Sequence, residues 1–162
     1  MTAAYRAVAG RIRQDLDDIA AISGRVRAIW DQYRDTGDEY YVDAAALNVH
    51  HLYAGLVRIF ETIARDVDQS MPESPHWHED LPDQMGSSVP SPRPAVLSTE
   101  LRRRLESYRG FRHVVRNVYT IDFDPEQMAP LVRRLPTVRD DVIEELRAFA
   151  DTLERIADES TE

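Results

Sequence analysis

The chain contains neither cysteine nor lysine. All 20 of its basic residues are arginines, against 29 aspartates and glutamates, and its formal net charge is −9 over 162 residues. The absence of cysteine excludes disulfides, thiolate catalysis and cysteine-ligated zinc. The acidic balance argues against nucleic-acid binding by the surface as a whole, but it leaves room for one local cationic site.

Long apolar runs are also missing. No hydrophobic stretch approaches the roughly 20 residues that a membrane-spanning helix needs. The first residues, Met1 to Arg6, lead into a charged segment and not into the apolar core of a signal peptide. A Gly-rich phosphate loop and a serine–histidine–aspartate order are absent as well. We therefore expect a cytoplasmic protein with no membrane segment and no cofactor.

Hydrophobic residues recur at helical spacing along most of the chain. The pattern predicts two long antiparallel helices, a third helix after an N-cap at Ser98, and a C-terminal pair of helices that starts at Asp124-Pro125 and at Pro136-Thr137. The first three helices are expected over about 3–34, 40–69 and 99–120. Alternating β-branched runs do not occur. The sequence thus predicts an all-α helical bundle, with residues 1–162 as a single domain.

Residues 70–97 break this pattern, because six of the nine prolines fall there. We predict a Pro-rich loop inserted between helices, with a short helical segment near Trp77–Met85. His76 and His78 flank Trp77 like a metal clip, but no further histidine is near in sequence, so we expect an anchored loop and no metal site. His50 and His51, on the second helix, are interpreted as core or interface histidines.

One face of the third predicted helix carries cations without acids. At about 100° per residue, Arg109, Arg112 and Arg116 share a side with His113 and Asn117. We call these three arginines the arginine face. The opposite side, which runs from Tyr108 to Tyr119, is apolar and is expected to enter the core.

Two interpretations of the arginine face stay open. It either pairs with acids on the other helices, for example Asp43, Glu61 or Asp66, or it binds phosphate. Guanidinium groups hold phosphate oxygens in bidentate fashion, and an imidazole such as that of His113 titrates in the range that suits proton transfer.

The segment from Phe111 to Tyr119 resembles the signature of HepT-like toxins of the HEPN superfamily, in which an arginine and a polar residue precede a histidine and a tyrosine. The resemblance implies an all-α homodimer with a metal-independent ribonuclease cleft. Arg112 and His113 match the first two positions, and Tyr119 matches a tyrosine that a nucleotidyltransferase antitoxin of the MntA type silences by adding AMP. Arg109 and Arg116 would bind RNA phosphates.

Asn117 departs from this motif, because it stands where the family has its catalytic histidine. An asparagine amide is neither an acid nor a base near neutral pH. Three interpretations follow: the protein binds RNA without cutting it, His113 supplies the proton transfer, or Asn117 is an engineered inactivation. A rival function of another class is a non-catalytic interaction module whose arginine face binds an acidic protein.

Overall fold

The computed structural model describes residues 2–88, 93–117 and 123–161, and these residues form five helices. Helix α1 spans Thr2–Thr36 and α2 spans Tyr40–Asp66. Helix α3 spans Trp77–Met85, α4 spans Thr99–Asn117, and α5 spans Pro125–Glu159. The all-α fold predicted from the sequence is confirmed.

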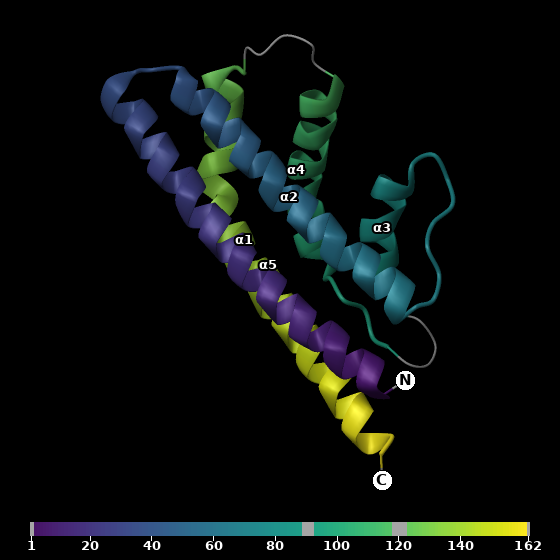
Figure 1. Cartoon of the computed structure of the whole chain (residues 1–162). Helices are drawn as coiled ribbons and strands as arrows, with labels where there is room; N and C mark the ends of the chain where they lie inside the picture. Colours follow the sequence, from purple (N-terminus) through teal and green to yellow (C-terminus); the bar gives the residue numbers. More distant parts are fainter. Residues whose placement is uncertain (1, 89–92, 118–122, 162) are drawn as a thin grey trace.

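The long hairpin of α1 and α2 turns at Gly37. Its φ of 68° lies in the left-handed region that glycine adopts without strain, and its amide donates to the Tyr33 carbonyl at 2.8 Å. Helix α5 runs along α1, so that both ends of the chain lie at the same end of the molecule (Figure 1). Arg13 joins these two helices by ion pairs to Asp151 at 2.7 Å and Glu154 at 2.5 Å. Helices α3 and α4 lie on the other side of α2.

The C-terminal segment differs from the predicted pair of helices, because α5 continues through Pro130 and Pro136. An interior proline costs about 3 kcal/mol, since it removes a hydrogen bond and crowds the preceding turn. Buried side chains keep helical register across both prolines, and burying each contributes about 1.5–3 kcal/mol. They are Met128, Leu131, Leu135, Val138 and Val142. This continuous apolar stripe outweighs the cost of the prolines. Asp124 caps the helix as predicted, its side chain accepting from the Glu126 amide at 2.9 Å.

The described part of the Pro-rich segment packs against the bundle. Leu81 and Met85 of α3 are fully buried, and the Met85 carbonyl accepts hydrogen bonds from the amides of Val96 and Leu97. The Ser98 hydroxyl then caps α4 by accepting from the Leu101 amide at 3.1 Å. The predicted short helix and the predicted N-cap are both confirmed, and together they position α4 beside α2.

Candidate functional site on helix α4

The rotation of α4 is set by its first half. Leu101, Leu105 and Tyr108 are buried at spacings of four and three residues, and Arg112 is the next residue on the same stripe. Arg112 is consequently half-buried, facing α2. Burial lowers the pKa of its guanidinium, and the positive charge of Arg116 lowers this pKa further. An arginine stays protonated in proteins, so the fold holds a partly desolvated cation here.

This rotation corrects the predicted apolar face. Tyr108 is buried and the half-buried Phe111 packs against the core, as expected, but Val114 is 41% exposed, so that part of the predicted side does not enter the core. The apolar pattern of the motif segment alone misplaced it, because the buried residues upstream decide which side faces α2.

The arginine face has no acidic partner in the described part of the chain. No carboxylate there lies within 4.0 Å of any of its three guanidinium groups. Of the acids expected as partners, Asp66 lies near Arg11 at 3.8 Å and Arg65 at 3.4 Å, and Glu61 acts on Arg112 only through its more distant charge. These contacts favour the interpretation that the arginine face binds an external anion.

Two histidines join this face from other helices. Burial lowers the pKa of His50, on α2, and of His78, on α3, and in both cases the charges of Arg112 and Arg116 lower it further. The Nδ1 atoms of both imidazoles are buried without a hydrogen-bond partner among the described residues. The His78 ring also contacts the Trp77 ring, with 3.6 Å between the ring centroids and 49° between the ring planes. Both groups are therefore neutral at pH 7 and able to accept a proton.

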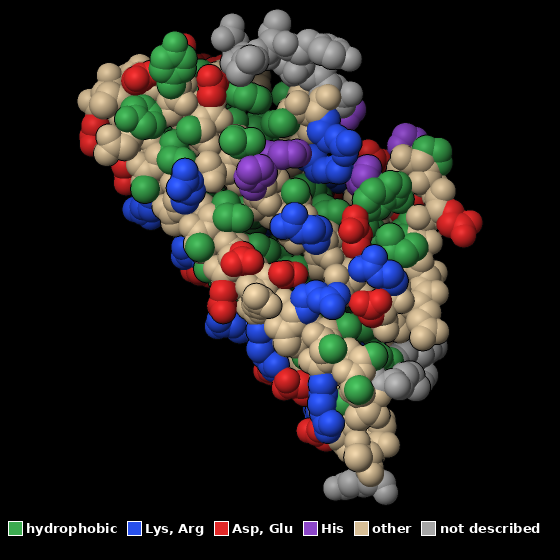
Figure 2. All heavy atoms as spheres, in the orientation of Figure 1, with side chains coloured by type: hydrophobic (Ala, Val, Ile, Leu, Met, Phe, Trp, Pro, Cys, Tyr) green, Lys and Arg blue, Asp and Glu red, His purple; other side chains and the backbone are tan. Residues whose placement is uncertain are grey.

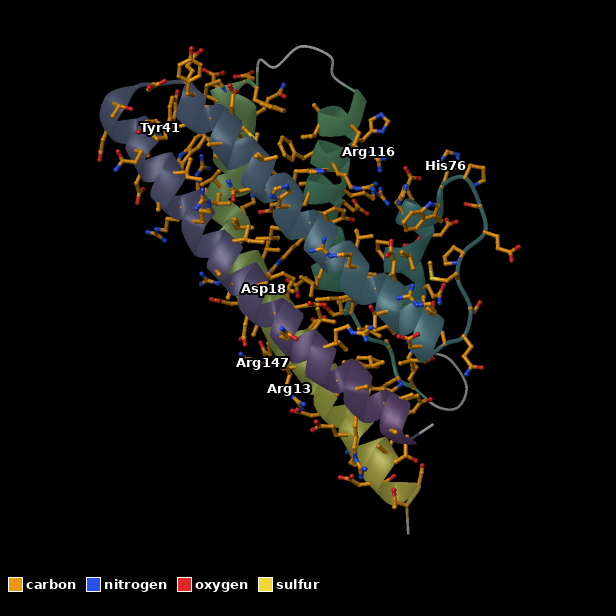
Figure 3. The ribbon with its side chains drawn as sticks, in the orientation of Figure 1. Arg13, Asp18, Tyr41, His76, Arg116 and Arg147 are labelled. Carbon is orange, nitrogen blue, oxygen red and sulfur yellow. The ribbon has the colours of Figure 1, made fainter. Side chains whose placement is uncertain are left out.

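The surface view shows histidine and arginine side chains close together on one part of the molecule (Figure 2). Histidine side chains surround arginine side chains where α2, α3 and α4 approach one another (Figure 2). Arg116 extends from the far half of α4 toward the side on which His76 precedes α3 (Figure 3). His113, the imidazole expected in the site, is exposed on the outside of α4. Asn117 ends α4, but its side chain and the whole of Tyr119 lie outside the described residues.

A hollow of about 360 Å³ extends the site between α3 and the start of α4. Arg102, Arg103 and Arg109 line it with Tyr53 of α2, and so do Asp83, which lies 3.4 Å from Arg102, and Glu106. Burial raises the pKa of Tyr53 to about 12, which keeps its hydroxyl protonated at neutral pH as a hydrogen-bond donor. In the part of the chain that the structure describes, no group of three or more metal-ligating side chains is assembled. None of its helices is long and apolar enough to cross a bilayer.

A family model described as HepT-like protein matches residues 44–153, about two thirds of the chain. The chain therefore belongs to the HepT-like family, as the motif from Phe111 to Tyr119 predicts. The matched range includes His50, His78 and the arginine face, so the whole site lies within the family region. Comparisons with curated proteins and with solved structures give no match.

Sequence reasoning missed His50 and His78 as site residues. Each comes from a helix remote in sequence from α4, and each has a plain structural interpretation when its own helix is considered alone. In the sequence, the only sign that either histidine belongs to the site was its place along its own helix. His50 directly follows the buried Val49. His78 is the second residue of the short helix that was predicted within the Pro-rich loop.

Proposed function

We propose that the chain is the toxin component of a toxin–antitoxin pair and that it binds RNA on the arginine face. The observation that supports this proposal is the half-buried guanidinium of Arg112, which has no carboxylate within ion-pair distance among the described residues. A desolvated and unpaired cation costs free energy. A phosphate group would supply both the opposite charge and the bidentate acceptor that a guanidinium prefers.

We further propose metal-independent cleavage of the bound RNA. A ribose 2′-oxygen bonds to the adjacent phosphorus, and the bond from phosphorus to the 5′-oxygen breaks. The 2′-hydroxyl proton passes to a neutral imidazole, and a protonated group returns a proton to the leaving 5′-oxygen. Arg112 and Arg116 stabilise the charge on the pentavalent phosphorus. Because Asn117 replaces the motif histidine, His50 and His78 are the candidate bases. His113, which is exposed, is the third candidate.

The partners in this proposal are a second copy of the chain and a nucleotidyltransferase antitoxin of the MntA type. Phe111 and Val114 are partly exposed on the outer side of α4 and line a hollow of about 540 Å³ together with Phe123 of the next segment. A second copy would cover this apolar strip and place two arginine faces at one cleft. AMP added to Tyr119 would bring negative charge to the end of α4 and compete with RNA.

Titration of labelled single-stranded RNA at several salt concentrations tests the proposal. Arg112→Gln and Arg116→Gln should each weaken binding and reduce the log–log salt slope by about 1. Arg147→Gln is the matched control, because Arg147 is exposed at the α1–α5 edge, away from α4 (Figure 3). Loss of cleavage but not of binding in His50→Ala or His78→Ala would identify the base. A protein that binds an acidic partner but no RNA would instead be the helical interaction module.

A further inference from the structure

A second arginine cluster lies between α4 and α5, outside the site described above. A hollow of about 460 Å³ there is lined by four arginines, two hydroxyl residues and one valine, and no acid is among the lining residues. They are Arg103, Arg104, Arg133, Arg134, Ser107, Thr137 and Val138. We call it the α4–α5 hollow. In a chain of net charge −9, such a concentration of positive charge requires an explanation.

Most of these cations have no internal counter-charge. Arg104 is paired with Glu100 at 2.7 Å and with Asp141. Within the described ranges, Arg103, Arg133 and Arg134 have no carboxylate within 4.0 Å. These three guanidinium groups are exposed around one hollow, so a phosphate placed there could accept hydrogen bonds from more than one of them.

The α4–α5 hollow is continuous with the arginine face. Arg103 lines both this hollow and the one that contains Arg109. These two residues are six positions apart on α4, so they point about 120° away from each other around the helix. The cations thus form a track that passes from one side of α4 to the other.

The other end of the track reaches aromatic side chains. Arg133 also lines a hollow of about 590 Å³ between the end of α1 and the start of α5, which it shares with Trp30 and Tyr33. Arg27 and Arg34 line this hollow too, as do the acids Asp31 and Glu126. The rings of Trp30 and Tyr33 are 4.9 Å apart, and both are partly exposed. Aromatic rings beside a cationic groove bind single-stranded nucleic acid, because bases stack on the rings while the cations hold the backbone.

We propose that the α4–α5 hollow binds the backbone of single-stranded RNA that extends past the arginine face, with bases directed to Trp30 and Tyr33. This inference rests on the RNA-binding function proposed above and adds a second contact region to it. The arginine face from Arg109 to Arg116 spans only about 10 Å of helix. A trinucleotide therefore occupies that face alone, whereas an RNA of about 16 nucleotides reaches both regions.

The test compares these two RNA lengths on Arg133→Gln/Arg134→Gln. We expect affinity for the long RNA to fall about tenfold and its salt slope to fall by about 1, with trinucleotide affinity unchanged. Arg139→Gln/Arg147→Gln is the matched control on the same helix, since both of its arginines lie near carboxylates. The single variants Arg133→Gln and Arg134→Gln serve if the double variant unfolds, and circular dichroism establishes folding in each.

The outcomes separate the two proposals. Unchanged long-RNA affinity in folded Arg133→Gln/Arg134→Gln, or in both single variants, overturns RNA binding by the α4–α5 hollow but leaves RNA binding by the arginine face intact. Equal losses for the trinucleotide and the long RNA also overturn it, because they place the arginines in the first site. A wild-type protein that binds neither RNA overturns the proposed function and this inference together.

Discussion

Arg93 and Asp68 form a buried, bidentate ion pair. The Arg93 Nε donates to Asp68 Oδ1 at 2.5 Å and its Nη2 donates to Asp68 Oδ2 at 2.7 Å, with both side chains at most 2% exposed. The remaining donors of Arg93 reach the carbonyls of Ser87, Pro94 and Gln84. One guanidinium thus connects the end of α2, the end of α3 and the segment that leads into α4. This connection positions α3, which contributes His78 to the site.

Arg93→Met should lower the free energy of unfolding by about 3–5 kcal/mol. The change removes one partner and leaves the Asp68 carboxylate buried without its cation, which costs far more than the pair itself contributes. Urea unfolding followed by circular dichroism measures it. Arg65→Met is the matched control, because Arg65 is 59% exposed beside Asp66 and an exposed pair contributes at most about 1 kcal/mol. Equal losses in the two variants would contradict this account.

Tyr108→Phe should destabilise the chain by about 1 kcal/mol. The buried Tyr108 hydroxyl donates to the Leu131 carbonyl of α5 at 2.7 Å, and phenylalanine removes only this hydrogen bond. Burial also raises the pKa of Tyr108, so the hydroxyl stays protonated and able to donate. Thermal unfolding of Tyr108→Phe and of Tyr40→Phe, whose side chain is 82% exposed, separates the bond from any general effect of losing a hydroxyl. A Tyr40→Phe variant that loses as much would refute the assignment.

Lowering the pH should destabilise the fold through His50 and His78. Their pKa values in the folded chain lie below 6.5, so below that pH the unfolded chain binds more protons and the free energy of unfolding falls. Their contribution is fully present above pH 6.5. We expect a lower urea midpoint at pH 5.5 than at pH 7.5, and a smaller difference in His50→Gln/His78→Gln. His51→Gln is the control, since the exposed His51 is solvated in both states.

Local signals made most of the fold predictable. Ser98 and Asp124 act through contacts within a few residues, and the structure has both of them where the sequence predicts it. The continuation of α5 through Pro136 was not predictable in this way. It depends on apolar contacts of α5 with α1 and α4. These contacts outweigh the local preference of proline to end a helix, and the sequence pattern indicates only that preference.

The candidate site was predictable on α4 and not beyond it. The arginine face follows from spacing within one helix, but its burial at Arg112 follows from Leu101 and Leu105, which lie about three and two turns earlier. His50 and His78 reach the same place only because α2 and α3 pack against α4. A contact between two helices that are remote in sequence leaves no recognisable pattern in the sequence of either helix.

Val114→Arg should convert the proposed homodimer to a monomer. Val114 is 41% exposed beside Phe111 on the outer side of α4, so a charge there costs little in the monomer but would be desolvated between two copies. Sedimentation velocity gives the mass of each variant. Leu47→Arg is the matched control, because Leu47 is an exposed apolar residue on α2, at 53%. A wild-type protein that sediments as a monomer at micromolar concentration would refute the dimer.

Co-expression with a cognate nucleotidyltransferase should add AMP to Tyr119. Transfer of one AMP group forms a bond between the tyrosine oxygen and the α-phosphorus of ATP and releases pyrophosphate. Intact-mass spectrometry should detect this addition, and Tyr119→Phe should abolish it. Tyr40→Phe is the matched control, because Tyr40 is an exposed tyrosine at the start of α2 and should leave the modification unchanged. The modified protein should also bind RNA more weakly, because the added phosphate puts negative charge three residues after Arg116 in the sequence and would compete for the arginine face. An unmodified Tyr119, or AMP on another tyrosine, would contradict this mode of control while leaving RNA binding by Arg112 and Arg116 to its own test.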